Sequence, residues 1–327
     1  MKPTWIANAP KKTIQPTVRE AHDADEHAQN LTNWQQQYDQ VSGGEFYGSL
    51  VELPFDELQV FKEHTSHALR QKCNVWSDAI WFGLPENGHK VSRINGLEIK
   101  DEHLMCRPGD TEFELITPQD FNIFGIVMPH QALHKMSEIQ EISLNWQDLM
   151  EQGRLTVPGK TLYHIRYLLD RILVSGNTAP PNKVITDMVM MSVLEVLKQK
   201  TSEMKVAPSF QRRKAVVDRV KTYVEDHPDA PVTITELCDV VSVSRRTLQY
   251  SFTSVLGISP LQFIRISRLN GARRALHNNL YLPSNQRVSI SDIASQWGFW
   301  HLSQFAKDYK QLFGELPSDT AKIHIHH

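Results

Sequence analysis

The stretch VSISDIASQWGFWHLSQFAKDYKQLFGELP, residues 288–317, predicts two short helices separated by a sharp turn. Ser289 or Ser291 can cap the first helix with its hydroxyl group. Gly298 tolerates the left-handed backbone conformation that such a turn requires. Beyond the turn, apolar residues recur every three or four positions, as on the buried face of a helix, at Leu302, Phe305, Tyr309 and Leu312. A short helix, a glycine turn and a second helix with a polar outer face form the plan of a helix-turn-helix.

The same pattern occurs a second time, further upstream. Leu237 precedes Ile293 by 56 positions. The landmarks of the second helix recur at an offset of 57, since Leu248, Phe252, Gly257 and Pro260 precede Phe305, Tyr309, Gly314 and Pro317. The change of offset falls within the turn, where an inserted residue disturbs packing least. Residues 233–257 and 289–314 are therefore predicted to be two copies of one DNA-binding helix-turn-helix unit.

The two units resemble the DNA-binding domain of the AraC/XylS family of transcription regulators. The motifs that carry the resemblance are the tandem units themselves, the long helix predicted between them, and the closing segments Gly-Ile-Ser-Pro at 257–260 and Gly-Glu-Leu-Pro at 314–317. It covers residues 211–320. The resemblance implies a regulator that binds double-stranded promoter DNA, contacts RNA polymerase and catalyses no reaction. It also implies an N-terminal jelly-roll-like β-barrel that senses a small-molecule effector.

Candidate DNA contacts follow from the resemblance and from side-chain chemistry. The side chains expected at base edges are Arg246, Gln249 and Tyr250 in the first unit and Ser303, Gln304 and Lys307 in the second. Arginine pairs with guanine and glutamine with adenine, whereas Tyr250 is equally suited to stacking or phosphate contact. Four arginines beside two recognition helices favour phosphate contact over a merely solvated basic face. The predicted phosphate contacts are Arg245, Arg265, Arg268, Arg273, Arg274 and Lys310.

The distribution of charge favours a DNA-binding C-terminal half, and the cysteine content argues against a disulfide scaffold or a zinc site. The chain of 327 residues has a formal net charge of −2, but residues 211–327 hold 15 Lys/Arg against 10 Asp/Glu, so the basic half coincides with the predicted DNA-binding domain. Three cysteines without a CxxC spacing favour neither a disulfide scaffold nor a zinc site. No apolar run approaches 18 residues and no signal-peptide core is present, so we expect a cytoplasmic protein that does not contact a membrane.

The N-terminal half changes character along its length. Residues 1–28 are polar and predict a mobile arm, and residues 29–205 predict the effector-sensing domain. Within that domain, short β-type runs between turn residues fill 45–128, and helical periodicity fills 129–205. The apolar stripes of these helices fit core packing and a homodimer seam equally well. Residues 206–210 are expected to form a linker and 321–327 a tail. The predicted fold class is α+β, with a β-rich sensor followed by an all-α DNA-binding domain.

A metal-dependent cupin enzyme is the rival interpretation of the β-rich segment. It requires closely spaced histidine ligands, typically His-x-His with a carboxylate. His64, His67 and His103 are present, but no His-x-His occurs before the C-terminal tail. Ordinary surface or core histidines are therefore favoured, and no metal site is predicted.

The β-rich segment combines aromatic side chains with carboxylates, which is the chemistry that recognises a small organic cation. The candidate effector-binding residues are Trp76, Trp81, Asp110, Glu112 and Glu114. The alternative is that the aromatic rings fill the core and the acids face water. Glu112 and Glu114 share one side of a strand, with Phe113 opposite.

Several segments of both halves resemble the members of this family that control ethanolamine utilisation in enteric bacteria. Among them are residues 31–39 (LTNWQQQYD), 107–115 (RPGDTEFEL) and 296–305 (QWGFWHLSQF). This resemblance implies an activator of an ethanolamine-utilisation operon, with ethanolamine and adenosylcobalamin as effectors. A regulator of another small-amine or catabolic operon is the alternative. No cofactor is expected to be required for DNA binding itself.

Overall fold

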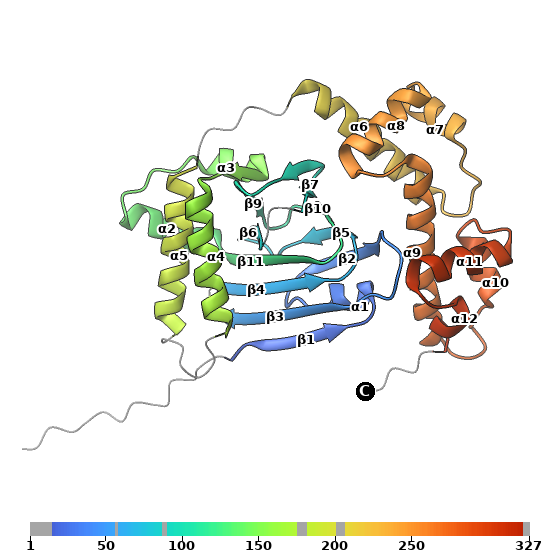
Figure 1. Ribbon diagram of the computed structural model, residues 1–327, viewed down its shortest axis with the longest axis horizontal. Coiled ribbons are helices and arrows are strands. Elements are labelled where there is room, and N and C mark those ends of the chain that lie inside the picture. Colours follow the sequence, from blue (N-terminus) through green and yellow to red (C-terminus); the bar gives the residue numbers. More distant parts are fainter. Residues whose placement is uncertain (1–14, 56–57, 87–89, 175–181, 201–206, 323–327) are drawn as a thin grey trace, which may run out of the picture.

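The computed structural model describes residues 15–55, 58–86, 90–174, 182–200 and 207–322. They form an N-terminal domain of two β-sheets with flanking helices and an all-helical C-terminal domain (Figure 1). No helix among these residues is both long and apolar enough to cross a membrane. The mixed fold class predicted from the sequence is confirmed at this level.

The two sheets are antiparallel throughout. The seven-stranded sheet contains, in spatial order, β1 (Thr17–Ala21), β3 (Gly48–Phe55), β4 (Leu58–Thr65), β11 (Phe121–Pro129), β6 (Ala79–Pro85), β9 (His103–Pro108) and β12 (Arg154–Thr156). The five-stranded sheet contains β2 (Gln35–Gln40), β5 (Leu69–Asn74), β10 (Phe113–Thr117), β7 (Ser92–Ile94) and β8 (Leu97–Ile99). Within the described residues each sheet ends in two edge strands, so the sheets do not close into a barrel, and the predicted jelly-roll-like arrangement is not confirmed.

The predicted N-terminal arm is partly wrong as well. Residues 1–14 lie outside the described residues, but residues 17–28 form strand β1 and helix α1 (Ala24–Ala28). Strand β1 pairs with β3 along its whole length. Asp23 caps α1 by accepting hydrogen bonds from the backbone N–H groups of Asp25 and Glu26. The sequence prediction missed this short capped helix because the segment is polar overall, although Ala24, His27 and Ala28 of the helix are buried.

The inner faces of the two sheets enclose an aromatic core. Trp81 and Phe113 stack with their ring centroids 4.8 Å apart. Gly83 and Gly125 are register partners on neighbouring strands, and a Cβ on either would collide with the ring of Trp81 or of Phe61. These glycines therefore make room for rings that lie flat against the sheet.

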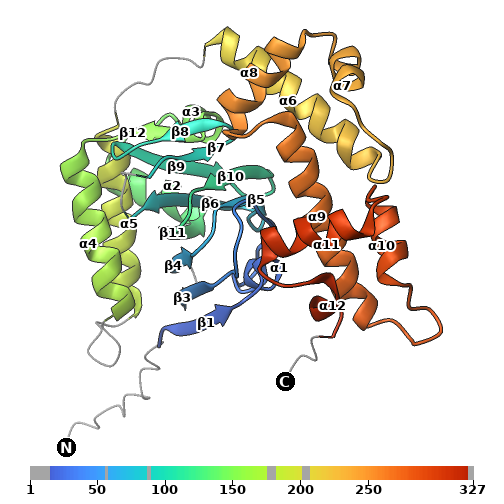
Figure 2. The ribbon, with the colours of Figure 1, turned by 45° about the vertical axis from the view of Figure 1, so that its right-hand side comes forward.

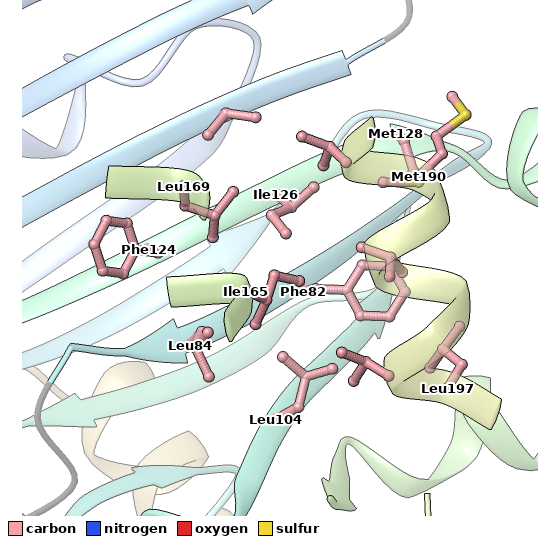
Figure 3. Close-up of a cluster of buried hydrophobic side chains, with 14 of the residues drawn as sticks. Phe82, Leu84, Leu104, Phe124, Ile126, Met128, Ile165, Leu169, Met190 and Leu197 are labelled. Carbon is pink, nitrogen blue, oxygen red and sulfur yellow. The ribbon is translucent and has the colours of Figure 1, made fainter. Parts of the chain in front are cut away.

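Four helices cover the outer face of the seven-stranded sheet: α2 (His130–Ile139), α3 (Trp146–Gln152), α4 (Gly159–Val174) and α5 (Asn182–Lys198). Their buried stripes, including Ile165, Leu169 and Met190, pack on strand residues such as Phe82 and Ile126 (Figure 3). The stripe predicted on α4 is thus core. On α5, Met188 and Met191 are instead exposed.

The C-terminal domain consists of α6 (Pro208–Asp226), α7 (Ile234–Val241), α8 (Arg245–Leu256), α9 (Pro260–Leu280), α10 (Ile290–Gln296), α11 (Leu302–Phe313) and α12 (Pro317–Thr320). One core joins α6, α7, α8 and the start of α9, and a second joins the rest of α9 to α10, α11 and α12. Helix α6 begins at Pro208, inside the predicted linker 206–210. Helix α9 is the element shared by both cores (Figure 2).

Candidate nucleic-acid interface

Each helix-turn-helix is held by local capping interactions. In the first unit, Thr233 and Glu236 form a capping box at the start of α7, and the turn places Ser242 in the left-handed region at φ 54°. In the second unit, Ser289 and Asp292 form the capping box of α10, and Gly298 lies at φ 75° in the turn. The two turns therefore use the same backbone conformation, which glycine adopts freely and serine only with strain.

The predicted base-reading side chains lie on the outer faces of α8 and α11. Arg246, Gln249 and Tyr250 are exposed, while Leu248 and Phe252 of the same helix are buried. On α11, Ser303, Gln304 and Lys307 are exposed, opposite the buried Phe305 and Tyr309. Leu302, which the apolar spacing placed on the buried face, is exposed as well, so that expectation is wrong. The Tyr250 ring faces the Arg213 guanidinium at 5.3 Å, so a residue of α6 supports it from the side. Each unit thus presents one polar triplet to solvent.

The six predicted phosphate contacts separate into two groups. Arg245 and Lys310 are exposed, and Arg265 is half-exposed beside Asp308. Arg268 is 8% exposed and donates a hydrogen bond to the backbone oxygen of Ala230. Arg273 is likewise buried, and Arg274 is partly covered, both against the N-terminal domain. In this arrangement only the first group is open to DNA phosphates.

Arg273 and Arg274 are instead bound by carboxylates of the N-terminal domain. The Arg273 Nε donates to Asp23 at 2.5 Å, and its Nη1 donates to Glu315 at 2.7 Å. The Arg274 Nη1 donates to Asp39 at 2.9 Å and approaches Asp25 at 3.3 Å. The sequence prediction failed here because it could not see that acids about 250 positions upstream lie against this helix.

The pKa values of the two acids in α1 and at its cap move in opposite directions. Burial acts to raise the pKa of Asp23, but His277, whose Nε2 lies 3.6 Å from the carboxylate, and the charge of Arg273 outweigh it and hold that pKa below its ordinary value. Burial raises the pKa of Asp25 to about 7, because Arg274 offsets only part of the effect and the charges of Asp23 and Asp39 add to it. Asp25 therefore holds its proton to a higher pH than an ordinary aspartate, whereas Asp23 releases its proton more readily.

A second contact between the domains involves Glu114, one of the predicted effector-binding residues. Its carboxylate accepts hydrogen bonds from Arg70 at 2.6 Å and from Lys221 of α6 at 2.8 Å. Burial alone acts to raise the pKa of Glu114, but these two cations lower it. Nearby, Lys72 bonds to Glu225 at 2.6 Å. Glu114 thus joins the two domains, and its carboxylate is already bound by two cations of the protein.

The other four predicted effector residues do not converge on one site. Phe113 is buried between the sheets, so Glu112 and Glu114 point to the outer face, and Glu112 is exposed. Asp110 is exposed in a turn at φ 55°. Trp81 is fully buried, with no hydrogen-bond partner for its indole N–H among the described residues, and Trp76 is half-buried. The aromatic rings fill the core, as the alternative interpretation held.

A cavity of about 930 Å³ lies between the two domains. Its walls come from the region of α1 on one side and from α9 and α11 on the other. The charged lining consists of five carboxylates and two arginines: Asp23, Asp25, Glu26, Glu45, Glu315, Arg273 and Arg274. Phe46, Phe313 and Tyr281 contribute rings. Sequence reasoning missed these residues, although the run Asp23-Ala-Asp-Glu26 was a visible acidic signal.

The described residues contain no group of three or more histidines, cysteines or acids placed to hold a metal ion. The histidines of the cupin interpretation have ordinary partners. His64 bonds to Asn122 at 3.0 Å, and His67 bonds to Ser66 at 2.8 Å.

Comparison with known proteins identifies the family. A family model described as a helix-turn-helix domain matches residues 237–323. The XylDLEGF operon transcriptional activator 2 of Pseudomonas putida is 30% identical over 139 residues, which cover 42% of this chain and 83% of that protein. The chain belongs to the AraC/XylS family of transcription regulators. This AraC/XylS-family chain is accordingly a DNA-binding regulator and not an enzyme.

Two other family relatives differ in how much they share. The XylDLEGF operon transcriptional activator 3 of Pseudomonas putida is 29% identical over 248 residues, covering 72% of this chain and 70% of that protein, so its likeness extends into the N-terminal domain. The probable thc operon regulatory protein of Rhodococcus erythropolis is 36% identical over 100 residues, covering 31% of this chain and 29% of that protein.

Proposed function

We propose that this chain activates transcription of a catabolic operon by placing α8 and α11 in two adjacent major grooves, under control of a small organic cation. The observation that carries the proposal is the pair of exposed polar triplets on tandem helices of one domain. Ethanolamine is the first candidate for the cation, by the resemblance described above.

The DNA part of the proposal rests on side-chain chemistry. Arginine and glutamine on an exposed recognition helix can bond to guanine and adenine edges in the major groove. Arg245 and Lys310, also exposed, are placed on the same helices to neutralise phosphates. A nuclease-protection assay on the promoter of an adjacent operon should show two protected half-sites about 34 Å apart on one face of the DNA. Absence of any sequence-specific protection at low salt would contradict it.

The effector part rests on the interdomain cavity. An ammonium group is stabilised by a carboxylate and by an aromatic face, and this cavity offers both, with Asp25 an acid that burial keeps protonated to a higher pH than usual. Ethanolamine is too small for burial of apolar area to contribute much affinity, so placed polar groups must supply it. The proposal for adenosylcobalamin as a second effector rests on the resemblance alone.

Calorimetry on the full chain tests the effector. Ethanolamine, choline and adenosylcobalamin are titrated separately and together near pH 6.5. Binding of a cation beside Asp25 should release a proton, so the observed heat should depend on the ionisation enthalpy of the buffer. Asp25→Asn should abolish that dependence, whereas Glu112→Gln, at an exposed acid outside the cavity, should not. Heat with choline alone would favour another amine operon, and heat with none of the three would remove the cation proposal.

We also propose that two copies of the chain associate through the outer faces of α4 and α5. These faces expose Tyr163, Tyr167, Val174, Val184, Met188 and Met191, an unusually apolar set for solvated helices. Sedimentation should give a dimer for the wild type and a monomer for Tyr167→Glu. A monomeric wild type at micromolar concentration would contradict the pairing.

Contact with RNA polymerase, which activation requires, is likewise a proposal.

A further inference from the structure

The N-terminal end of the second recognition helix carries two exposed apolar side chains. Leu302 is the first residue of α11 and is 48% exposed. Trp300, in the turn just before the helix, is 66% exposed. The predicted base-reading residues Ser303 and Gln304 follow directly on the first turn of α11 and are exposed as well. Apolar surface that the folded chain leaves in water therefore lies beside the polar residues that are expected to meet DNA.

The turn of the second unit is one residue longer than the turn of the first, and the extra residue is Trp300. Val243 precedes Phe299 by 56 positions, and both side chains pack against the core of their unit. Ser244 precedes His301 by 57 positions, and each is the N-cap residue of its recognition helix. Trp300 lies between these two matched pairs. The first unit forms its turn without a residue at this place, so closing the turn does not require a tryptophan.

Packing does not require a leucine at position 302 either. With the offset of 57, the equivalent residue of the first unit is Arg245, which is likewise the first residue of its helix and is exposed. By contrast, the equivalent residues Leu248 and Phe305 are both apolar and both buried. The two units thus share the residues that build their cores and differ at a position that is open to solvent in both. The apolar character of Leu302 is therefore available for a contact outside the chain.

The position of Leu302 and the chemistry of DNA identify that contact. In a helix-turn-helix, the N-terminal residues of the recognition helix contact base edges in the major groove. The apolar group exposed in that groove is the 5-methyl group of thymine, which apolar side chains contact. Bringing this methyl group against a leucine removes apolar area of both partners from water. DNA is the partner that this surface fits, because it is continuous with the base-reading residues Ser303 and Gln304.

We propose that Leu302 is a specificity-determining residue that selects thymine through its 5-methyl group in the half-site read by α11, with Trp300 extending the apolar surface. The inference rests on the proposed DNA-reading function and adds a preference to it. The first unit presents the Arg245 guanidinium at the equivalent position, so this thymine preference belongs to the second half-site alone.

Substitution of single DNA atoms tests the contact. Each thymine of the protected operator is replaced in turn by deoxyuridine, which lacks the methyl group and keeps every hydrogen-bonding group of thymine. The affinity of the full chain is then measured for each duplex. In one half-site, at least one replacement should weaken binding by the wild type about fourfold, the value expected for one buried methyl group.

Two variants with side chains of similar length separate polarity from shape. Leu302→Gln should bind the thymine and uracil duplexes equally well at that position, whereas Leu302→Met should keep the fourfold preference. Leu261→Gln is the matched control, because Leu261 is also exposed but lies on α9 outside both helix-turn-helix units, and it should keep the preference. Since Leu302 is half-exposed, the thermal unfolding of both Leu302 variants should match that of the wild type.

The outcomes are distinct. A wild type that protects a specific operator and binds its uracil duplexes without loss would overturn the inference. So would equal thymine-to-uracil ratios in Leu302→Gln and Leu302→Met. A preference that survives Leu302→Gln and disappears in Trp300→Gln would assign the methyl contact to the indole ring and overturn the role of Leu302. A wild type that protects no specific sequence would contradict the proposed function, and the inference with it.

Discussion

Asn270 and Gln40 exchange a pair of hydrogen bonds across the boundary between the domains. The Gln40 backbone N–H donates to the Asn270 Oδ1 at 2.9 Å, and the Asn270 Nδ2 donates to the Gln40 backbone oxygen at 3.0 Å. Gln40 ends β2, the edge strand of the five-stranded sheet. The side-chain amide thus satisfies two backbone groups that a neighbouring strand would otherwise pair with.

Replacing this amide should loosen the contact between the domains. Asn270→Ala leaves a buried N–H and a buried C=O of Gln40 without these partners, which costs about 1–3 kcal/mol. Amide hydrogen exchange at Gln40 should accelerate accordingly. Asn279→Ala is the matched control, because Asn279 makes the same kind of paired contact with Val288 inside the C-terminal domain. Equal exchange at Gln40 in both variants would show that the Asn270 pair does not hold the domains together.

The stability of the chain should depend on pH through Asp25. The folded chain retains the Asp25 proton up to about pH 7, whereas an unfolded aspartate releases it near 3.8. Between these values the folded state binds more protons, so this contribution to stability is complete below about pH 4 and is lost as the pH rises towards 7. Asparagine cannot ionise and avoids the loss. Asp25→Asn should therefore have a higher free energy of unfolding than the wild type at pH 8, by up to about 4 kcal/mol, and match it at pH 4.

Denaturation curves at several pH values measure this difference directly. Glu112→Gln, at an exposed acid, serves as the control and should show no such trend. If Asp25→Asn is less stable than the wild type at pH 8, the pairing of Asp25 with Arg274 outweighs the cost of burying its charge, and the ionised Asp25 does not destabilise the folded chain.

Salt dependence should distinguish the arginines that bind DNA from those that bind the N-terminal domain. Arg245→Gln and Lys310→Gln should each reduce the slope of log affinity against log salt by about 1, because each removes one phosphate contact. Arg273→Gln should leave the slope unchanged, since its guanidinium is bound to Asp23 and Glu315. A reduced slope for Arg273→Gln would restore the phosphate role predicted from the sequence.

A fragment beginning at residue 207 should fold and bind DNA alone, because the C-terminal domain contains two cores of its own. Removing the N-terminal domain also releases Arg273, Arg274 and Lys221 from the carboxylates of that domain. The DNA affinity of the fragment should therefore fall more steeply with salt concentration than the DNA affinity of the full chain. A filter-binding titration across salt concentrations compares the two, and a fragment with a shallower slope would mean that the N-terminal domain adds DNA contacts.

The sequence predicted the features whose signals are local. Capping residues such as Ser289 and the apolar spacing from Phe305 to Leu312 specify the helices and their exposed faces, because an i to i+4 pattern lies within one helix. It could not predict contacts set by long-range packing. Glu114 and Lys221 are 107 positions apart, and Arg273 and Asp23 are 250 apart. From the sequence alone, Glu114 near aromatic residues looks like part of a ligand site, and Arg273 on a helix looks like a phosphate contact. Only the structure shows that each side chain pairs with a residue of the other domain.

Helix α9 has 21 residues, and at about 1.5 Å per residue its axis is roughly 31 Å long. The two helix-turn-helix units are built on its opposite ends, so their separation is close to one turn of B-form DNA, about 34 Å. A continuous helix cannot stretch or rotate its ends independently. The operator must therefore have a fixed spacing between its two half-sites. Five added base pairs would move one half-site to the opposite face of the duplex, and ten would move it beyond the reach of the second unit.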